Sequence, residues 1–398
     1  MYNPYEELEN NILVINKQVK VLKYLRPINE LEEKEKFLKK QIEPKFEYRT
    51  NQDYDLKKVM HYLNSITIPT KPNDRLKNMA NGLLEVYDYK TKFSNKKLDD
   101  TLKELAVPYF NVIKNILAKT KILDNLGNHR IIKNETSKIY GIPSDDTIIK
   151  AKNTLLRLKD IKQPKKDIDP AYVSTYMRKK IEEFGLDKDG WVTSISKRKK
   201  ATLTSSLNKK IKIGSKMYSK ELLDSLTIHE VGVHAILANN GSKQPFKIFQ
   251  FGFPLQSETN EGLATYFERY KGSGNDIKLR KYAARCVAVK SVLEDNSFSK
   301  TFKELRSYNL SLEMSWEVSM RAHRGGGCIK DHIYFEGLEK IKNYEESYEP
   351  LFTGRVSLNY VDLIKEMIKK DLIKSPKSSN DLIFPYFAKR ESQKLITT

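Results

Sequence analysis

The stretch Thr227-Ile228-His229-Glu230-Val231-Gly232-Val233-His234 decides what kind of site and fold this chain of 398 residues is expected to have. Two histidines with a glutamate beside the first are the raw material of a zinc hydrolase site. The common zinc-binding helix has the pattern His-Glu-x-x-His, with two residues between the glutamate and the second histidine. Here three residues intervene.

The extra residue changes where the two histidines point. Residues four apart on an α-helix differ by about 40° around its axis, whereas residues five apart differ by about 140°. A π-bulge closes hydrogen bonds five residues apart and returns such residues to one face. Gly232 lies between the histidines, where backbone distortion costs least. The spacing therefore predicts a π-bulge from His229 to His234, within a helix that Ser219 caps.

A catalytic zinc ion takes three protein ligands and leaves one position for water. His229 and His234 are two candidate ligands, and Glu261, in a downstream helix, is the expected third. Glu230 is expected to lie beside the metal ion and to act as the general base. Glu258 and Glu268 belong to the same downstream region, and each is a candidate to orient a histidine through its other ring nitrogen.

Composition limits the classes of protein that fit. Hydrophobic residues make up 39% of the chain, which is typical of a globular protein, and no apolar run is long enough to span a membrane. The first residues contain no signal peptide, and two cysteines are too few for a disulfide framework, so a cytoplasmic location is expected. The net charge of +21 fits either simple solubility or attraction of an acidic partner, and nucleic acid is not the expected partner.

The order of the expected elements indicates an α+β protein. Apolar periodicity predicts helices over 6–25, 29–40, 75–92, 98–118 and 145–159, which make residues 1–165 a helical N-terminal region. Short β-branched runs at 191–195, 201–205 and 210–214 predict a small antiparallel sheet ahead of the histidine-bearing helix. This order is typical of zincin-like catalytic domains, here expected over 166–376. Residues 377–398 form a polar tail.

Several motifs together resemble a known family, that of the microtubule-associated tyrosine carboxypeptidases and their bacterial relatives. The resemblance extends over about residues 15–376, and Asn260 stands where the family's Gln-Glu-Gly-Leu-Ala motif has glutamine. The motifs that carry it are Pro27-Ile28-Asn29, Glu35-Lys36-Phe37, Tyr140–Pro143, His229–His234, Asn240–Pro245, Asn260–Ala264, Arg321–Gly325, Lys330–Gly337 and Leu351–Arg355.

The resemblance implies a zinc metallopeptidase with His229, His234 and Glu261 as ligands and Glu230 as base. It also implies a carboxypeptidase that removes a tyrosine-like residue from a peptide or protein tail, such as the acidic tail of tubulin. A cation is then needed to hold the terminal carboxylate of the substrate. The candidates for that role are Arg321, Arg324, Lys330 and Arg355. Tyr334 and His323 are candidates to stabilise the oxyanion.

Two other interpretations fit parts of the sequence. A dipeptidyl-peptidase-III-like exopeptidase also has a His-Glu-x-x-x-His motif, but it resembles this chain at that motif alone. A basic binding protein with a structural metal site would account for the charge. The sequence has no interleaved aromatic and basic residues of the kind that bind nucleic acid, and it keeps Glu230, the expected general base.

Overall fold

The structure is a computed structural model that describes residues 5–6, 8–10, 12–13, 99–125, 128–159, 161, 164–196, 202–269, 276–323, 327 and 329–376. The predicted helices at 29–40 and 75–92 and the predicted tail at 377–398 lie outside these residues. The described helices are α6 (Asp100–Glu104), α7 (Ala106–Asp124), α8 (His129–Tyr140), α9 (Asp145–Arg157), α10 (Pro170–Glu183), α11 (Lys220–Thr227), α12 (Ile236–Ser242), α13 (Ile248–Phe251), α14 (Gln256–Glu268), α15 (Asp276–Leu293), α16 (Phe298–Ser307), α17 (Leu312–His323), α18 (Ile333–Asn343) and α19 (Val361–Lys369).

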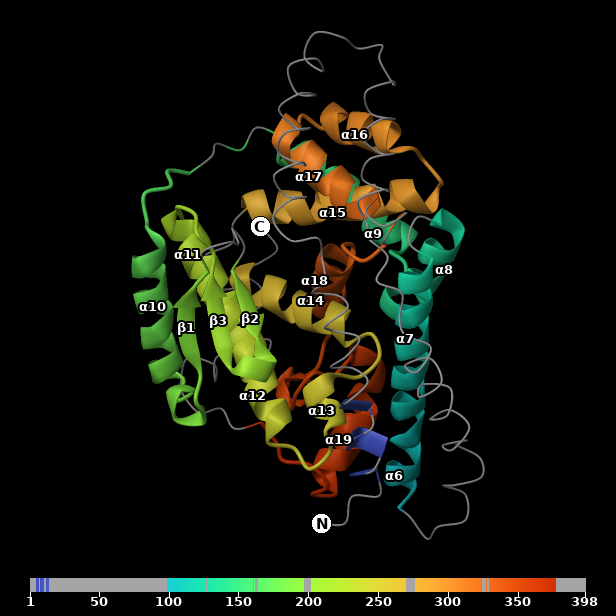
Figure 1. Cartoon of the computed structure of the whole chain (residues 1–398), viewed down its shortest axis with the longest axis vertical. Helices are drawn as coiled ribbons and strands as arrows, with labels where there is room; N and C mark the ends of the chain where they lie inside the picture. The colour runs from blue at the N-terminus through green and yellow to red at the C-terminus, as the bar shows by residue number, and fades with distance from the viewer. Residues whose placement is uncertain are drawn as a thin grey trace.

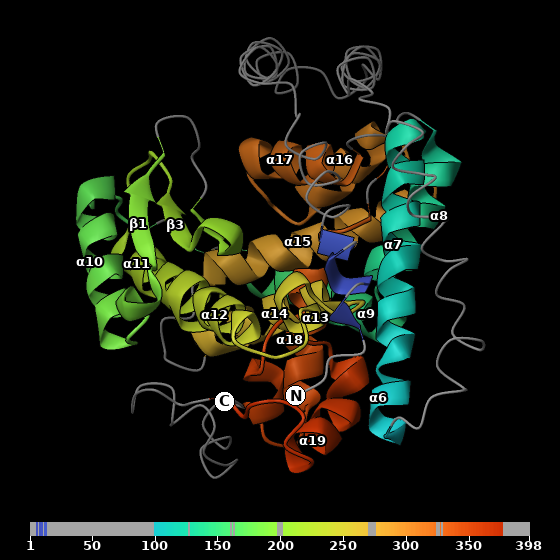
Figure 2. The ribbon, with the colours of Figure 1, turned by 60° about the horizontal axis from the view of Figure 1, so that its bottom comes forward.

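The molecule is mostly helical, with a small sheet at one side. Figure 1 shows α10 and the sheet on one flank, α7 and α8 on the opposite flank, and α14 and α18 between them. The view in Figure 2 agrees, and it places α19 at the end opposite α16 and α17. No helix in the described part of the chain is both long and apolar enough to cross a bilayer.

The predicted antiparallel sheet is corrected by the structure, in which the sheet is mixed. It contains β1 (Val192–Ile195), β2 (Leu203–Ser205) and β3 (Lys210–Ile213), in the order β1-β3-β2. β3 pairs parallel with β1 and antiparallel with β2. The alternation in β3 buries Ile211 and Ile213 completely, so this strand takes the centre. β2 exposes Leu203 and lies at an edge of the sheet, where unpaired backbone groups face outward.

The helix that carries the two histidines is continuous but not uniform. Ser219 Oγ accepts a hydrogen bond from the Leu222 backbone N–H and so caps α11, as predicted. A π-helical stretch, Ile228–Ala235, follows directly, and α12 continues from it. We call Ile228–Ala235 the π segment. The predicted π-bulge from His229 to His234 is thereby confirmed.

α14 and α18 cross at two glycines. A Cβ atom added at Gly262 would lie 2.4 Å from the Gly337 carbonyl oxygen, and one added at Gly337 would lie 2.2 Å from the Glu258 carbonyl oxygen. The absence of side chains at both positions therefore lets the two backbones touch. This contact holds α14, which carries Glu261, against α18, which carries Tyr334.

One hydrophobic core joins the N-terminal helices to the rest of the described chain, with buried members from Tyr5 through Leu105 and Ile213 to Ile373. Tyr5 stacks on Tyr109 of α7, with ring centroids 4.6 Å apart. The predicted helices at 98–118 and 145–159 correspond to α6, α7 and α9. The division at residue 165 stays a prediction.

Substitution of Gly262 by alanine is expected to destabilise the protein, because the added methyl group would overlap the backbone of α18. Such overpacking costs about 1–3 kcal/mol, measurable as a lower midpoint of urea denaturation. Gly232→Ala is the matched control, since a Cβ there would meet no atom closer than Ile228 Cγ2 at 4.0 Å. Equal stabilities of the two variants would contradict the close crossing of α14 and α18.

Candidate metal centre

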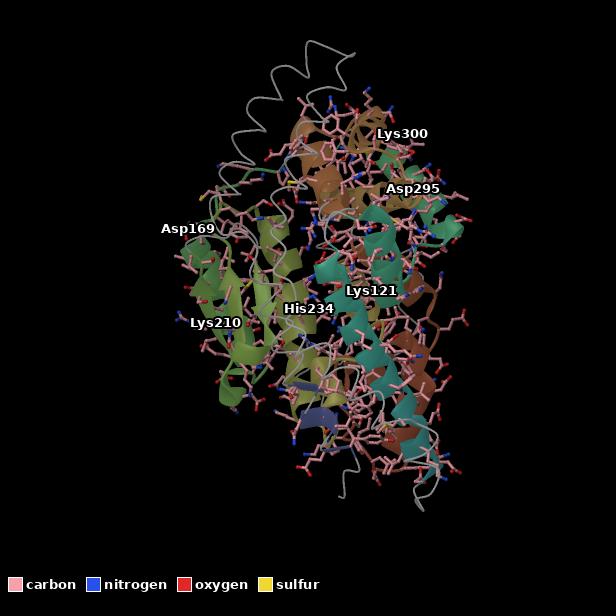
Figure 3. The ribbon with its side chains drawn as sticks, turned by 45° about the vertical axis from the view of Figure 1, so that its right-hand side comes forward. Lys121, Asp169, Lys210, His234, Asp295 and Lys300 are labelled. Carbon is pink, nitrogen blue, oxygen red and sulfur yellow. The ribbon has the colours of Figure 1, made fainter. Side chains whose placement is uncertain are left out.

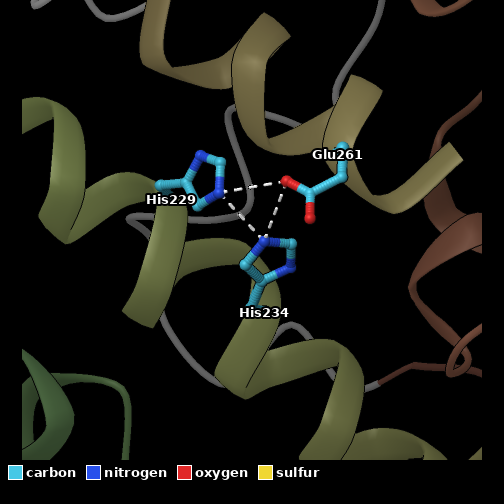
Figure 4. Close-up of side chains that lie close together, drawn as sticks. All are labelled: His229, His234 and Glu261. Carbon is cyan, nitrogen blue, oxygen red and sulfur yellow. Dashed lines mark hydrogen bonds and ion pairs between the residues drawn. The ribbon is translucent and has the colours of Figure 1, made fainter. Parts of the chain in front are cut away.

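Three side chains from two elements converge at the centre of the molecule. Figure 4 shows His229 and His234, from the π segment, facing Glu261 of α14. The two Nε2 atoms are 3.0 Å apart, and Glu261 Oε2 lies 3.3 Å from that of His229 and 3.5 Å from that of His234. In Figure 3 His234 lies in the middle of the molecule, whereas Lys210 and Lys300 lie at its periphery.

The electrostatics of this cluster come from buried acids beside the two imidazoles. Burial alone would lower the pKa of His229, but the charge of Glu268 and contacts with Glu261 and Glu268 outweigh it and raise that pKa to about 10. Burial likewise opposes ionisation of Glu261, yet His234 and His229 hold its pKa well below the usual range. The cluster thus attracts positive charge strongly.

A shell of contacts fixes the first histidine. His229 Nδ1 lies 2.5 Å from Glu268 Oε1, which also accepts a hydrogen bond from Lys278 Nζ. With Nδ1–H directed at Glu268, Nε2 is the ring atom that faces Glu261 and His234 and could bind a metal ion once it loses its proton. The other candidate for this role, Glu258, instead pairs with Lys340 at 2.7 Å.

Glu230 follows His229 in the π segment, and its side chain is held by the sheet. Thr204 Oγ1, on edge strand β2, donates a hydrogen bond to Glu230 Oε2 at 2.6 Å and lies 3.0 Å from the Glu230 carbonyl oxygen. Glu230 is buried. The hydrogen bond to Oε2 orients the Glu230 carboxylate. The sequence contained no signal for Thr204, because its role depends on the order of the strands.

The residues present fit a metal ion. Within the described residues, His229, His234 and Glu261 form the group of side chains whose donor atoms are close enough together to share one. Glu261 Oε2 is buried and accepts no hydrogen bond of normal geometry. A tetrahedral zinc site with bonds of about 2.0–2.1 Å has ligand atoms about 3.3 Å apart, close to the three separations observed here.

Tyr334, a candidate for oxyanion stabilisation, lies near the three converging side chains. Burial and the charge of Glu261 raise its pKa above the usual value. Its ring stacks on that of Tyr282, with centroids 4.9 Å apart and planes 7° from parallel. The Arg285 guanidinium carbon lies 5.0 Å from the centre of the Tyr334 ring. Tyr282 and Arg285, both on α15, were not identified from the sequence.

The remaining candidates are placed elsewhere or are already occupied. Arg321 donates two hydrogen bonds to Asp331, at 2.5 and 2.8 Å. His323 is buried against Thr301, 2.8 Å away, so this candidate for oxyanion stabilisation is not brought to the three converging side chains. Lys330 lies over the Tyr140 ring, and Arg355 donates to Ser206 Oγ at 2.8 Å. Arg324 lies outside the described residues.

Fold and site together define a helical α+β protein with a His–His–Glu donor set and a neighbouring carboxylate. The chain belongs to the microtubule-associated tyrosine carboxypeptidase family, whose model matches residues 35–386. The predicted resemblance to this family is thereby confirmed.

Individual relatives match over a shorter length. Microtubule-associated tyrosine carboxypeptidase 1 of Homo sapiens is 27% identical over 179 residues, which cover 40% of this chain and 36% of that protein. The proteins of the same name from Rattus norvegicus and Mus musculus are also 27% identical over 179 residues. The match thus spans little more than a third of these relatives. No solved structure matches the chain.

Substitution of Glu268 by glutamine is expected to weaken binding of zinc by about 10- to 100-fold, because His229 loses the carboxylate that orients its ring. Competition with a chromophoric chelator measures this affinity. The matched control is Glu258→Gln, on the same helix but in contact with Lys340. An unchanged affinity in Glu268→Gln, or an equal loss in both variants, would show that the Glu268 contact does not orient a metal ligand.

Proposed function

We propose that this protein is a zinc-dependent carboxypeptidase that removes a tyrosine-like residue from the C-terminus of a peptide or protein tail. The observation that carries the proposal is the convergence of His229, His234 and Glu261 beside a buried Glu230. Two imidazoles and one carboxylate are the donor set of several catalytic zinc sites, with a fourth position open to water or substrate.

His229, His234 and Glu261 would hold the zinc ion. When bound, zinc polarises a carbonyl oxygen and makes a water molecule more acidic. The two histidines must bind through neutral Nε2 atoms. The contact between His229 Nδ1 and Glu268 favours the tautomer that leaves Nε2 free.

Glu230 is the proposed general base. Its Oε1 atom takes a proton from the attacking water, whose oxygen forms a bond to the scissile carbonyl carbon. The same proton then passes to the leaving amine as the carbon–nitrogen bond breaks, so Glu230 ends ionised again. Thr204 holds Oε2 through this cycle, which keeps the carboxylate from turning away.

The family name and the charge support the choice of substrate. The relatives are named as microtubule-associated tyrosine carboxypeptidases, which points to a protein tail that ends in tyrosine and to a cytoplasmic location. The net charge of +21 would attract an acidic tail such as that of tubulin over a range set by the ionic strength.

Substitution of Glu230 by glutamine is expected to reduce peptidase activity about 10²- to 10⁴-fold and to leave the zinc content unchanged, because the amide cannot accept the proton. Mass spectrometry of a peptide library gives the cleavage rate, and elemental analysis gives the zinc content. Glu221→Gln is the matched control, since Glu221 is exposed on α11 of the same continuous helix.

Full activity of the Glu230→Gln protein would exclude Glu230 as the base. A zinc-loaded parent protein that cleaves no peptide would contradict the proposed activity itself. Cleavage of peptides amidated at the C-terminus would exclude the carboxypeptidase mode.

A further inference from the structure

Arg285 lies on the face of α15 that looks toward the candidate metal centre. Lys278, Tyr282 and Arg285 recur at three- to four-residue spacing, so they share one side of this helix. Lys278 contacts Glu268, and Tyr282 stacks on Tyr334. The guanidinium carbon of Arg285 is 5.7 Å from the centre of the Tyr282 ring and 5.0 Å from that of Tyr334.

The Arg285 side chain has no anionic partner among the described residues. Its Nε–H group is buried and donates no hydrogen bond. Lys281 is the main cause that lowers the pKa of Glu317 and Arg321 is the main cause that lowers the pKa of Asp331, and the charge of Arg285 adds to both effects. Lys281 binds Glu317 at 2.6 Å, and Arg321 binds Asp331 through two hydrogen bonds.

The Nε–H group of Arg285 is costly in this position, because a buried donor has lost water and gained no acceptor in exchange. The faces of two tyrosine rings offset part of this cost. Rings contact the face of the guanidinium and do not use its N–H groups. Nε–H therefore lacks an acceptor, and the planar guanidinium pairs Nε–H with a neighbouring Nη–H group in the geometry that binds the two oxygens of a carboxylate.

The position of Arg285 connects it to the centre. Tyr334 links the two, because Arg285 lies over its ring and its helix, α18, crosses α14, which carries Glu261. The burial of Tyr282 raises its pKa, as do the charges of Glu268 and Glu261. An anion bound at Arg285 would thus lie across the two tyrosines from the Glu261 carboxylate.

We propose that Arg285 forms a carboxylate-binding subsite that holds the C-terminal carboxylate of the peptide substrate. This assignment rests on the proposed carboxypeptidase function and replaces Arg321 in that role, because Arg321 already binds Asp331. Tyr282 and Tyr334 form the wall between this subsite and the side chains proposed to bind zinc.

The test measures binding to the zinc-loaded Glu230→Gln protein, so that no cleavage is needed. The probes are three fluorescently labelled hexapeptides that end in tyrosine. The first has internal glutamates and a free C-terminus, and the second is the same peptide with a C-terminal amide. The third has a free C-terminus and glutamines in place of the glutamates. Both free acids are expected to bind about 10- to 100-fold more tightly than the amide. Adding Arg285→Gln is expected to abolish this preference.

Two further variants keep the test decisive. Arg285→Lys retains the positive charge but lacks the planar fork of the guanidinium, so it is expected to keep only part of the preference for the free acid. It also serves as the test if Arg285→Gln does not fold. Lys290→Gln removes a charge from the same helix at the surface, where Lys290 pairs with Asp145, and it is expected to keep all of the preference.

Full preference for the free acid in Arg285→Gln, or in Arg285→Lys, would overturn the assignment. So would a preference that follows the internal glutamates, since Arg285 would then bind a side-chain carboxylate. Failure of the proposed function is distinguishable, because it is measured separately as the lack of cleavage by the parent protein.

Discussion

The convergence of His229 and His234 on one carboxylate depends on a helix that is wound more widely than an α-helix. A regular α-helix would point residues five apart to different sides by about 140°. The π segment brings their Nε2 atoms to 3.0 Å and places Glu230 next to His229, against the edge strand of the sheet. A wider turn leaves a less favourable hydrogen-bonding pattern, so π-helical turns persist mainly where function needs them.

The rest of the fold places contacting side chains around the π segment. The close crossing of α14 and α18 at Gly262 and Gly337 brings Glu261 and Tyr334 to the same centre. β2 supplies Thr204 from the other side. α15 passes along the centre with Lys278, which neutralises Glu268. Each element therefore contributes one contact to a buried, highly charged cluster that the hydrophobic core surrounds.

The features that the sequence predicted correctly are those that depend on short-range geometry. The spacing of the histidines and Gly232 predicted the π-bulge, Ser219 predicted the start of α11, and the Glu261 position followed from its helix. The order of the strands was wrong, because three short β-branched runs do not reveal which one takes the centre. The buried alternation of Ile211 and Ile213 in β3 is the feature that decides it.

Arg285 was not predicted from the sequence, for a related reason. It lies in α15 among Ala283, Ala284, Cys286 and Val287, which are all buried, so the sequence around it is typical of a core helix. Arg321 was a candidate because it lies in a family motif, yet its guanidinium donates hydrogen bonds to Asp331, ten residues further along the chain. The packing of α15, α17 and α18 determines which arginine forms no ion pair, and the sequence alone does not reveal it.

X-ray absorption spectroscopy at the zinc edge, on the purified protein with its zinc content measured, tests the central claim most directly. We expect one zinc ion per chain, coordinated by two imidazole nitrogens and by oxygen at about 2.0–2.1 Å. His234→Ala should lose one imidazole from the spectrum. A protein that binds no zinc at one equivalent, or a spectrum with sulfur ligands that His234→Ala leaves unchanged, would contradict the metal centre.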